Sequence, residues 1–104
     1  MQHFNNLTPA EAERLAILAE ECGEILQVIG KILRHGYDSV NPCVEHAPSN
    51  RQHLAIELGD LKCVTSIMVN FDDITEAAIT DACKEKTKNI RRWLHHQSDF
   101  GGTL

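Results

Sequence analysis

The chain lacks any apolar run that approaches the roughly 20 residues of a membrane-spanning helix, and its N-terminal stretch is polar, unlike a secretory signal. It also lacks a dense basic run, since 15 Asp and Glu stand against 10 Lys and Arg, which gives a formal net charge of −5 at pH 7. A general nucleic-acid binder carries a basic patch or stripe. We therefore expect a cytoplasmic protein that binds neither a membrane nor polymeric nucleic acid.

The chain lacks closely spaced cysteines, since its four cysteines are widely separated and show no Cys-x-x-Cys pair. The four residues are Cys22, Cys43, Cys63 and Cys83. A small disulfide-stabilised domain has many closely spaced cysteines, which this chain does not have. We expect reduced thiols, in agreement with a cytosolic protein.

The sequence also shows no alternation of apolar and polar residues typical of strands and no internal repeat, so the predicted fold class is all-α. We expect one domain over residues 1–104, with three long antiparallel helices at about 8–35, 50–70 and 73–97. The segment 36–49 contains two prolines and a glycine and should form a long loop, which is a candidate lid or partner contact. Three amphipathic helices make an incomplete bundle, so we expect it to be completed by oligomerisation, as a homodimer or a dimer of dimers.

Two of the predicted helix starts carry capping signals. Thr8 can cap the first helix, with Pro9 at the first helical position and Glu11 completing a capping box. For the third helix we expect Asp73 as the cap, with Glu76 three residues later.

Three acids interrupt the first helix within the stretch "LAEECGEILQV". At 100° per residue, the apolar residues of this helix cover roughly half of its circumference. Glu21 falls inside that apolar arc and Glu24 at its border, whereas Glu20 points toward solvent. Two of the three acids are thus in unusual positions for an ordinary amphipathic helix.

The second helix carries two more acids in the apolar arc. Glu57 falls between Val64 and Met68 on the helical wheel, and Asp60 also falls in the middle of the apolar face. An isolated ionised carboxylate on a buried face is strongly disfavoured, and two acids at a spacing of three also repel each other. We expect some partner to neutralise them.

Antiparallel packing of the first two helices would bring both acid pairs together, and a divalent cation would remove their mutual repulsion. Oxygen ligands suit Mg²⁺ or Mn²⁺ better than zinc or copper. One alternative is a buried ion network with Lys86 or Arg51. A second alternative is a di-iron carboxylate bundle, but that site needs Glu-x-x-His pairs, and neither acid pair has a histidine at that spacing.

Two motifs carry a family resemblance. "EECGE" at 20–24 followed by "ELGD" at 57–60 resembles the Glu-Glu-x-x-Glu and Glu-x-x-Asp pair of the MazG-like, all-α nucleoside triphosphate pyrophosphohydrolases. The proline-containing loop before the second motif is similar to short members from bacteria and their phages. The resemblance covers roughly residues 10–94, nearly the whole chain.

This resemblance implies hydrolysis of a (deoxy)nucleoside triphosphate between its α and β phosphates, which gives a monophosphate and pyrophosphate. It implies Mg²⁺ as the cofactor, with Mn²⁺ as a substitute. The implied metal ligands are Glu21, Glu24, Glu57 and Asp60. Glu20 matches the first glutamate of the motif and would order or deprotonate the attacking water, with Glu21 as the rival for that role.

The resemblance also implies contacts to the substrate phosphates. On the third helix Lys86 lies among apolar residues and Asn89 lies at the edge of that face, and they resemble the basic and amide positions that family members use to contact phosphates. Lys31, on the Glu24 side of the first helix, is a further phosphate partner. The base preference stays open. Two alternatives are a phosphoribosyl-ATP pyrophosphohydrolase and a non-catalytic helical interaction module that uses a metal site for folding.

Overall fold

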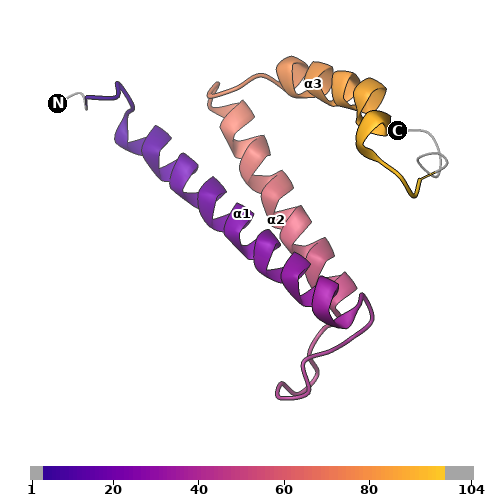
Figure 1. The fold of residues 1–104 in the computed structure, drawn as a ribbon. Helices are drawn as coiled ribbons and strands as arrows, with labels where there is room; N and C mark the ends of the chain where they lie inside the picture. The colour runs from indigo at the N-terminus through magenta and orange to yellow at the C-terminus, as the bar shows by residue number, and fades with distance from the viewer. Residues whose placement is uncertain (1–3, 98–104) are drawn as a thin grey trace. The chain divides into compact units, whose positions relative to one another are not determined.

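The computed structural model describes residues 4–97, so both ends of the predicted domain over residues 1–104 lie outside the described residues. Within residues 4–97 the chain is helical and forms no strand, which confirms the all-α prediction. The elements are α1 (Pro9–His35), α2 (Asn50–Asn70), α3 (Glu76–Asn89) and the short 3-10 helix η1 (Ile90–Trp93) (Figure 1). None of the helices in this range combines the length and the apolar character needed to cross a membrane.

The chain divides into two compact units, Met1–Asp73 and Ile74–Leu104. The first unit is a hairpin in which α1 and α2 run antiparallel and side by side (Figure 1). The second unit contains α3 and η1. The predicted single domain and its completion by other chains stay predictions.

Capping boxes begin both helices of the hairpin. Thr8 accepts a hydrogen bond from the backbone N–H of Glu11, whose carboxylate in turn accepts one from the Thr8 N–H. Ser49 and Gln52 make the same reciprocal pair before α2. Each pair satisfies backbone donors that a helix start leaves without partners, which fixes the first residue of the helix.

The core of the hairpin is small. Among the residues that the structure describes, the buried ones are Val28, Val64, Met68 and Glu57. Only three of the four are apolar, whereas large apolar side chains such as Leu26 and Leu33 are 68% and 82% exposed. Two helices alone cannot cover more than one face of each other, so apolar surface remains outside the hairpin.

The loop between α1 and α2 is anchored to the start of α2. Gly36 follows α1 with φ of 88°, a backbone conformation that favours glycine. The N–H of Asn50 donates to the carbonyl of Ser39 at 2.9 Å, and the N–H of Arg51 donates to the carbonyl of Tyr37 at 2.8 Å. The loop therefore leaves α1 and returns to α2 along a defined backbone path.

The third helix differs from its prediction over residues 73–97. It begins at Glu76, and its N-cap is Thr75, whose hydroxyl accepts from the N–H of Ala78 at 3.1 Å. The predicted cap, Asp73, is wrong, because its carboxylate is already bound by Arg14. The α-helix ends at Asn89 and continues as η1, a 3-10 turn of the kind that often ends an α-helix.

The pair between Arg14 and Asp73 ties the end of α2 back to α1. Arg14 Nε donates to Asp73 Oδ2 at 2.6 Å and Nη2 donates to Oδ1 at 2.8 Å, and both side chains are largely buried. The guanidinium also lies 4.6 Å from the ring centroid of Phe71. The hydrogen bonds from Arg14 lower the pKa of Asp73, even though desolvation opposes this shift. This end of the hairpin is held by a bidentate ion pair.

Candidate functional site

The two helices of the hairpin each present a pair of carboxylates at a spacing of three residues, which places each pair on one face of its helix. Because α1 and α2 are antiparallel neighbours, the pairs meet. The four acids form a group, called here the carboxylate cluster, in which one oxygen from each residue lies within 4.8 Å of all the others. Its members are Glu21, Glu24, Glu57 and Asp60.

Burial within the carboxylate cluster is graded. Glu57 is buried, with 7% of its surface exposed, Glu21 and Glu24 are partly buried, and Asp60 is exposed. The prediction that Asp60 lies in the middle of a buried face is therefore wrong for this hairpin. Its apolar neighbour on the wheel, Ile67, is likewise 40% exposed. A hairpin of two helices buries only a strip of each helix, and Asp60 lies outside that strip.

Two oxygens of the cluster have no protein partner. Glu21 Oε2 and Glu57 Oε2 are buried and accept no hydrogen bond from the described residues. The other oxygen of Glu57, Oε1, lies 3.2 Å from His53 Nε2. Buried polar atoms normally have partners, so two such oxygens in one acidic group fit a bound cation.

The electrostatics of the cluster point the same way. Desolvation raises the pKa of Glu21, and the negative charges of the neighbouring Glu24, Asp60, Glu57 and Glu20 raise it further. Both causes disfavour the ionised form that a metal ligand needs. A divalent cation among these oxygens would reverse the balance, since its charge stabilises the carboxylates.

The other predicted site residues of the hairpin lie near this cluster in sequence but outside it. Glu20 is exposed and is not a member. Lys31 is exposed and lies two helical turns after Glu24 on α1. Arg51, the alternative partner for the acids, is instead paired with Asp38, with Nε and Oδ1 3.3 Å apart.

Lys86 and Asn89 lie on α3, in the second unit. Lys86 is exposed. The amide of Asn89 donates to both the carbonyl and the carboxylate of Glu85 at 3.0 Å, one turn earlier on the same helix. Their contact with phosphates stays a prediction, as does the role of every residue in the carboxylate cluster as a metal ligand.

The sequence interpretation did not include His53. It lies four residues before Glu57, so the two side chains meet on one face of α2, and His53 is the one protein partner that the described residues give to Glu57. The sequence signal that could have identified His53 is its position one helical turn before an acid on an apolar face.

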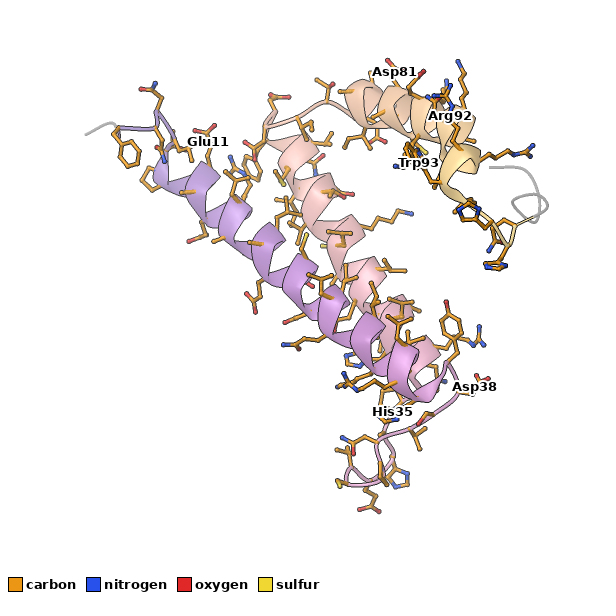
Figure 2. The ribbon with its side chains drawn as sticks, viewed as in Figure 1. Glu11, His35, Asp38, Asp81, Arg92 and Trp93 are labelled. Atoms are coloured by element: carbon orange, nitrogen blue, oxygen red, sulfur yellow. The ribbon has the colours of Figure 1, made fainter. Side chains whose placement is uncertain are left out.

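His53 also borders a cavity of about 780 Å³, which the sequence did not predict. The cavity lies between the loop 36–49 and the helix ends that the loop joins. Figure 2 shows this end of the hairpin, where His35 ends α1 and Asp38 lies in the loop.

Comparison with known proteins gives one match. The sequence profile of the MazG nucleotide pyrophosphohydrolase domain matches residues 10–96, which is most of the chain and includes all four members of the carboxylate cluster. Neither the curated proteins nor the solved structures contain a match. The resemblance inferred from the two acidic motifs is thereby confirmed, and the chain belongs to the MazG nucleotide pyrophosphohydrolase domain family.

Proposed function

We propose that this protein hydrolyses a (deoxy)nucleoside triphosphate to the monophosphate and pyrophosphate in a Mg²⁺-dependent reaction. The observation that carries this proposal is the carboxylate cluster, with four acids within 4.8 Å and two buried oxygens without partners. Membership of the nucleotide pyrophosphohydrolase family supports the reaction class.

The donor set suits the proposed cofactor. Glu21, Glu24, Glu57 and Asp60 offer only carboxylate oxygens, which favours Mg²⁺, with Mn²⁺ as a substitute. When bound, the cation supplies charge neutralisation and polarisation at the phosphoryl oxygens. Without a cation the four acids repel an anionic substrate, so substrate binding and metal binding are coupled.

The protein residues then position the water and the substrate. Glu20 is the better candidate for the base that accepts a proton from the attacking water, because Glu21 already contributes a buried oxygen to the cluster. Lys31, Lys86 and Asn89 would bind phosphate oxygens, which carry the charge that develops during phosphoryl transfer. The active form would be a homodimer or a dimer of dimers, which covers the exposed apolar residues of the hairpin.

The test is a product assay. The purified protein is incubated with Mg²⁺ and each common nucleoside triphosphate, and pyrophosphate is measured separately from single phosphate. We expect pyrophosphate and monophosphate in equal amounts. Glu57→Gln should lower kcat by at least about a hundredfold, because it removes a charged ligand from the metal.

Glu13→Gln is the matched control, since Glu13 is an exposed acid of α1 outside the cluster. It should leave the rate unchanged. The proposal fails if no nucleotide yields pyrophosphate, or if Glu57→Gln retains full activity. A melting temperature raised by Mg²⁺ without turnover would instead support the non-catalytic interaction module.

A further inference from the structure

The cavity at the loop end of the hairpin has two unlike walls. Its helix wall is cationic or polar and comes from the last turns of α1 and the first turns of α2, whereas its loop wall is mostly apolar. The helix wall consists of Lys31, Arg34, His35, Asn50 and His53. The apolar residues of the loop wall are Val40, Pro42, Val44, Ala47 and Pro48.

The charge of the helix wall is one-sided. Two basic residues, Lys31 and Arg34, and two histidines, His35 and His53, line the cavity, and no acidic residue does. Among the described residues, the side chains of Lys31, Arg34 and His35 have no hydrogen-bond or ion-pair partner. In a chain with a net charge of −5, this concentration of unpaired positive charge indicates an anionic ligand.

The donors that the helix wall offers to such a ligand are side chains. The first backbone N–H groups of α2 are already used, since those of Asn50 and Arg51 donate to loop carbonyls and that of Gln52 donates to Ser49 Oγ. The Asn50 side-chain amide donates to the carbonyl of Gly36 at 3.0 Å. On the helix wall, recognition of an anion therefore falls to the basic side chains.

The cavity neighbours the carboxylate cluster through His53, although no member of the cluster lines it. His53 lines the cavity, and its Nε2 lies 3.2 Å from Glu57 Oε1. Lys31 follows Glu24 by seven residues, which is about 10 Å along the helix axis. The guanidinium of Arg34 folds back over Gly30, one turn closer to the cluster than its own backbone, with Nη1 3.6 Å from where a Cβ on Gly30 would lie.

We propose that this cavity is a subsite for the pyrophosphate end of the substrate, the β and γ phosphates that leave together. The inference rests on the proposed function, in which the cluster holds the phosphates at the bond that breaks. The β and γ phosphates carry most of the substrate's negative charge, so they match the cationic wall. The apolar loop wall lowers the local dielectric and strengthens the attraction between Lys31, Arg34 and the phosphates.

This placement also orients the rest of the substrate. If the pyrophosphate end lies under the loop, the base and sugar extend from the cluster in the opposite direction, away from residues 36–49. The protein should then prefer triphosphates to diphosphates strongly, because a diphosphate leaves part of the cationic wall without a partner.

Product inhibition tests the inference directly. Inorganic pyrophosphate and the nucleoside monophosphate are each titrated as inhibitors of the wild-type protein and of Lys31→Gln/Arg34→Gln. We expect the inhibition constant for pyrophosphate to rise by about tenfold or more, as for the loss of charge-assisted hydrogen bonds. The constant for the monophosphate should change less than about twofold.

Lys62→Gln is the matched control, because Lys62 is an exposed lysine of α2 that does not line the cavity. It should leave both constants unchanged. The inference is overturned if the double variant weakens the monophosphate instead of pyrophosphate, since the cavity would then hold the nucleoside. It is also overturned if neither product is affected.

A binding measurement separates this inference from the proposed function. Inorganic pyrophosphate is added to the ¹⁵N-labelled wild-type protein without nucleotide, and the amide signals of Ser39 and Asn41, which line the cavity, are followed. Shifts that saturate in the wild type and disappear in the double variant support the subsite even if no nucleotide is hydrolysed. An active enzyme whose cavity signals do not respond to pyrophosphate would refute the subsite and leave the proposed function standing.

Discussion

The two carboxylate oxygens of Glu57 have different surroundings, and only one of them has a protein partner. Its Oε1 faces His53 Nε2 at 3.2 Å, and its Oε2 is buried without a protein partner. A carboxylate fixed in this way by a neighbouring side chain presents its remaining oxygen in one direction. Such outer contacts are a common means by which proteins orient metal ligands.

At the scale of single residues, an experiment can distinguish the proposed roles of the adjacent acids, Glu20 as the base and Glu21 as a metal ligand. Glu21→Gln removes a member of the cluster, so the increase in melting temperature caused by Mg²⁺ should largely disappear. Glu20→Gln changes an exposed acid outside the cluster, so the Mg²⁺ effect should remain while kcat falls by about a hundredfold.

The measurements are thermal denaturation with and without Mg²⁺, together with single-turnover kinetics. The two variants show the reverse pattern if Glu21 is the base and Glu20 the ligand. The assignment is wrong in that case, although the cluster itself would still bind the metal.

Much of the cluster could be predicted from the sequence, since the helical wheel places Glu21 and Glu57 among apolar residues. The exposure of Asp60 could not, because the wheel shows which residues share a face and not whether another helix covers that face. The contact of Glu57 with His53 could also have been predicted, because residues four positions apart lie on the same face of a helix.

At the scale of the elements, the sequence predicted a helix start correctly where the capping side chain bonds only to residues close to it in the chain. The capping box of Thr8 and Glu11 was predicted and is present. The start of α3 was not, because the carboxylate of Asp73 binds Arg14, a residue 59 positions away. A long-range ion pair of this kind leaves no local trace in the sequence, so Thr75 took the role assigned to Asp73.

The same ion pair gives a prediction for the dependence of stability on pH. Because the pKa of Asp73 is lower in the folded than in the unfolded protein, the pair stabilises the fold above the unfolded pKa. This contribution is lost as the pH falls through the folded pKa. Asp73→Asn should lower the melting temperature by a few degrees at pH 7 and by less at strongly acidic pH.

Thermal denaturation of both proteins across this pH range measures the difference. Asp72→Asn is the neighbouring control, since Asp72 is exposed and does not bind Arg14. A difference in melting temperature that is the same at every pH would contradict an ionic contribution from Asp73.

At the scale of the whole molecule, the apolar surface that the hairpin leaves uncovered matters most. The large exposed residues of α1 on the side away from the buried Val28 form a stripe, defined as Leu15, Leu26, Ile29 and Leu33. Exposed apolar stripes on helices commonly mark interfaces. We expect another copy of this chain to cover this stripe.

Leu26→Glu tests that expectation, because Leu26 is 68% exposed and lies on the stripe. A charge in an apolar interface is strongly unfavourable, so the variant should shift the protein toward the monomer at micromolar concentration. Sedimentation velocity measures the change, with Gln27→Glu as the adjacent control outside the stripe. An unchanged mass would rule out this stripe as the interface.

The anchoring of the loop has a consequence for how such a protein can diversify. In two backbone hydrogen bonds between the loop and α2, the carbonyls of Tyr37 and Ser39, near the start of the loop, accept from the N–H groups of Arg51 and Asn50 at the start of α2. The cavity-lining side chains further along the loop, such as Pro42 and Val44, belong to neither helix. Mutations there can reshape the pocket while the cluster and the hairpin stay intact, so ligand preference can evolve separately from the metal chemistry.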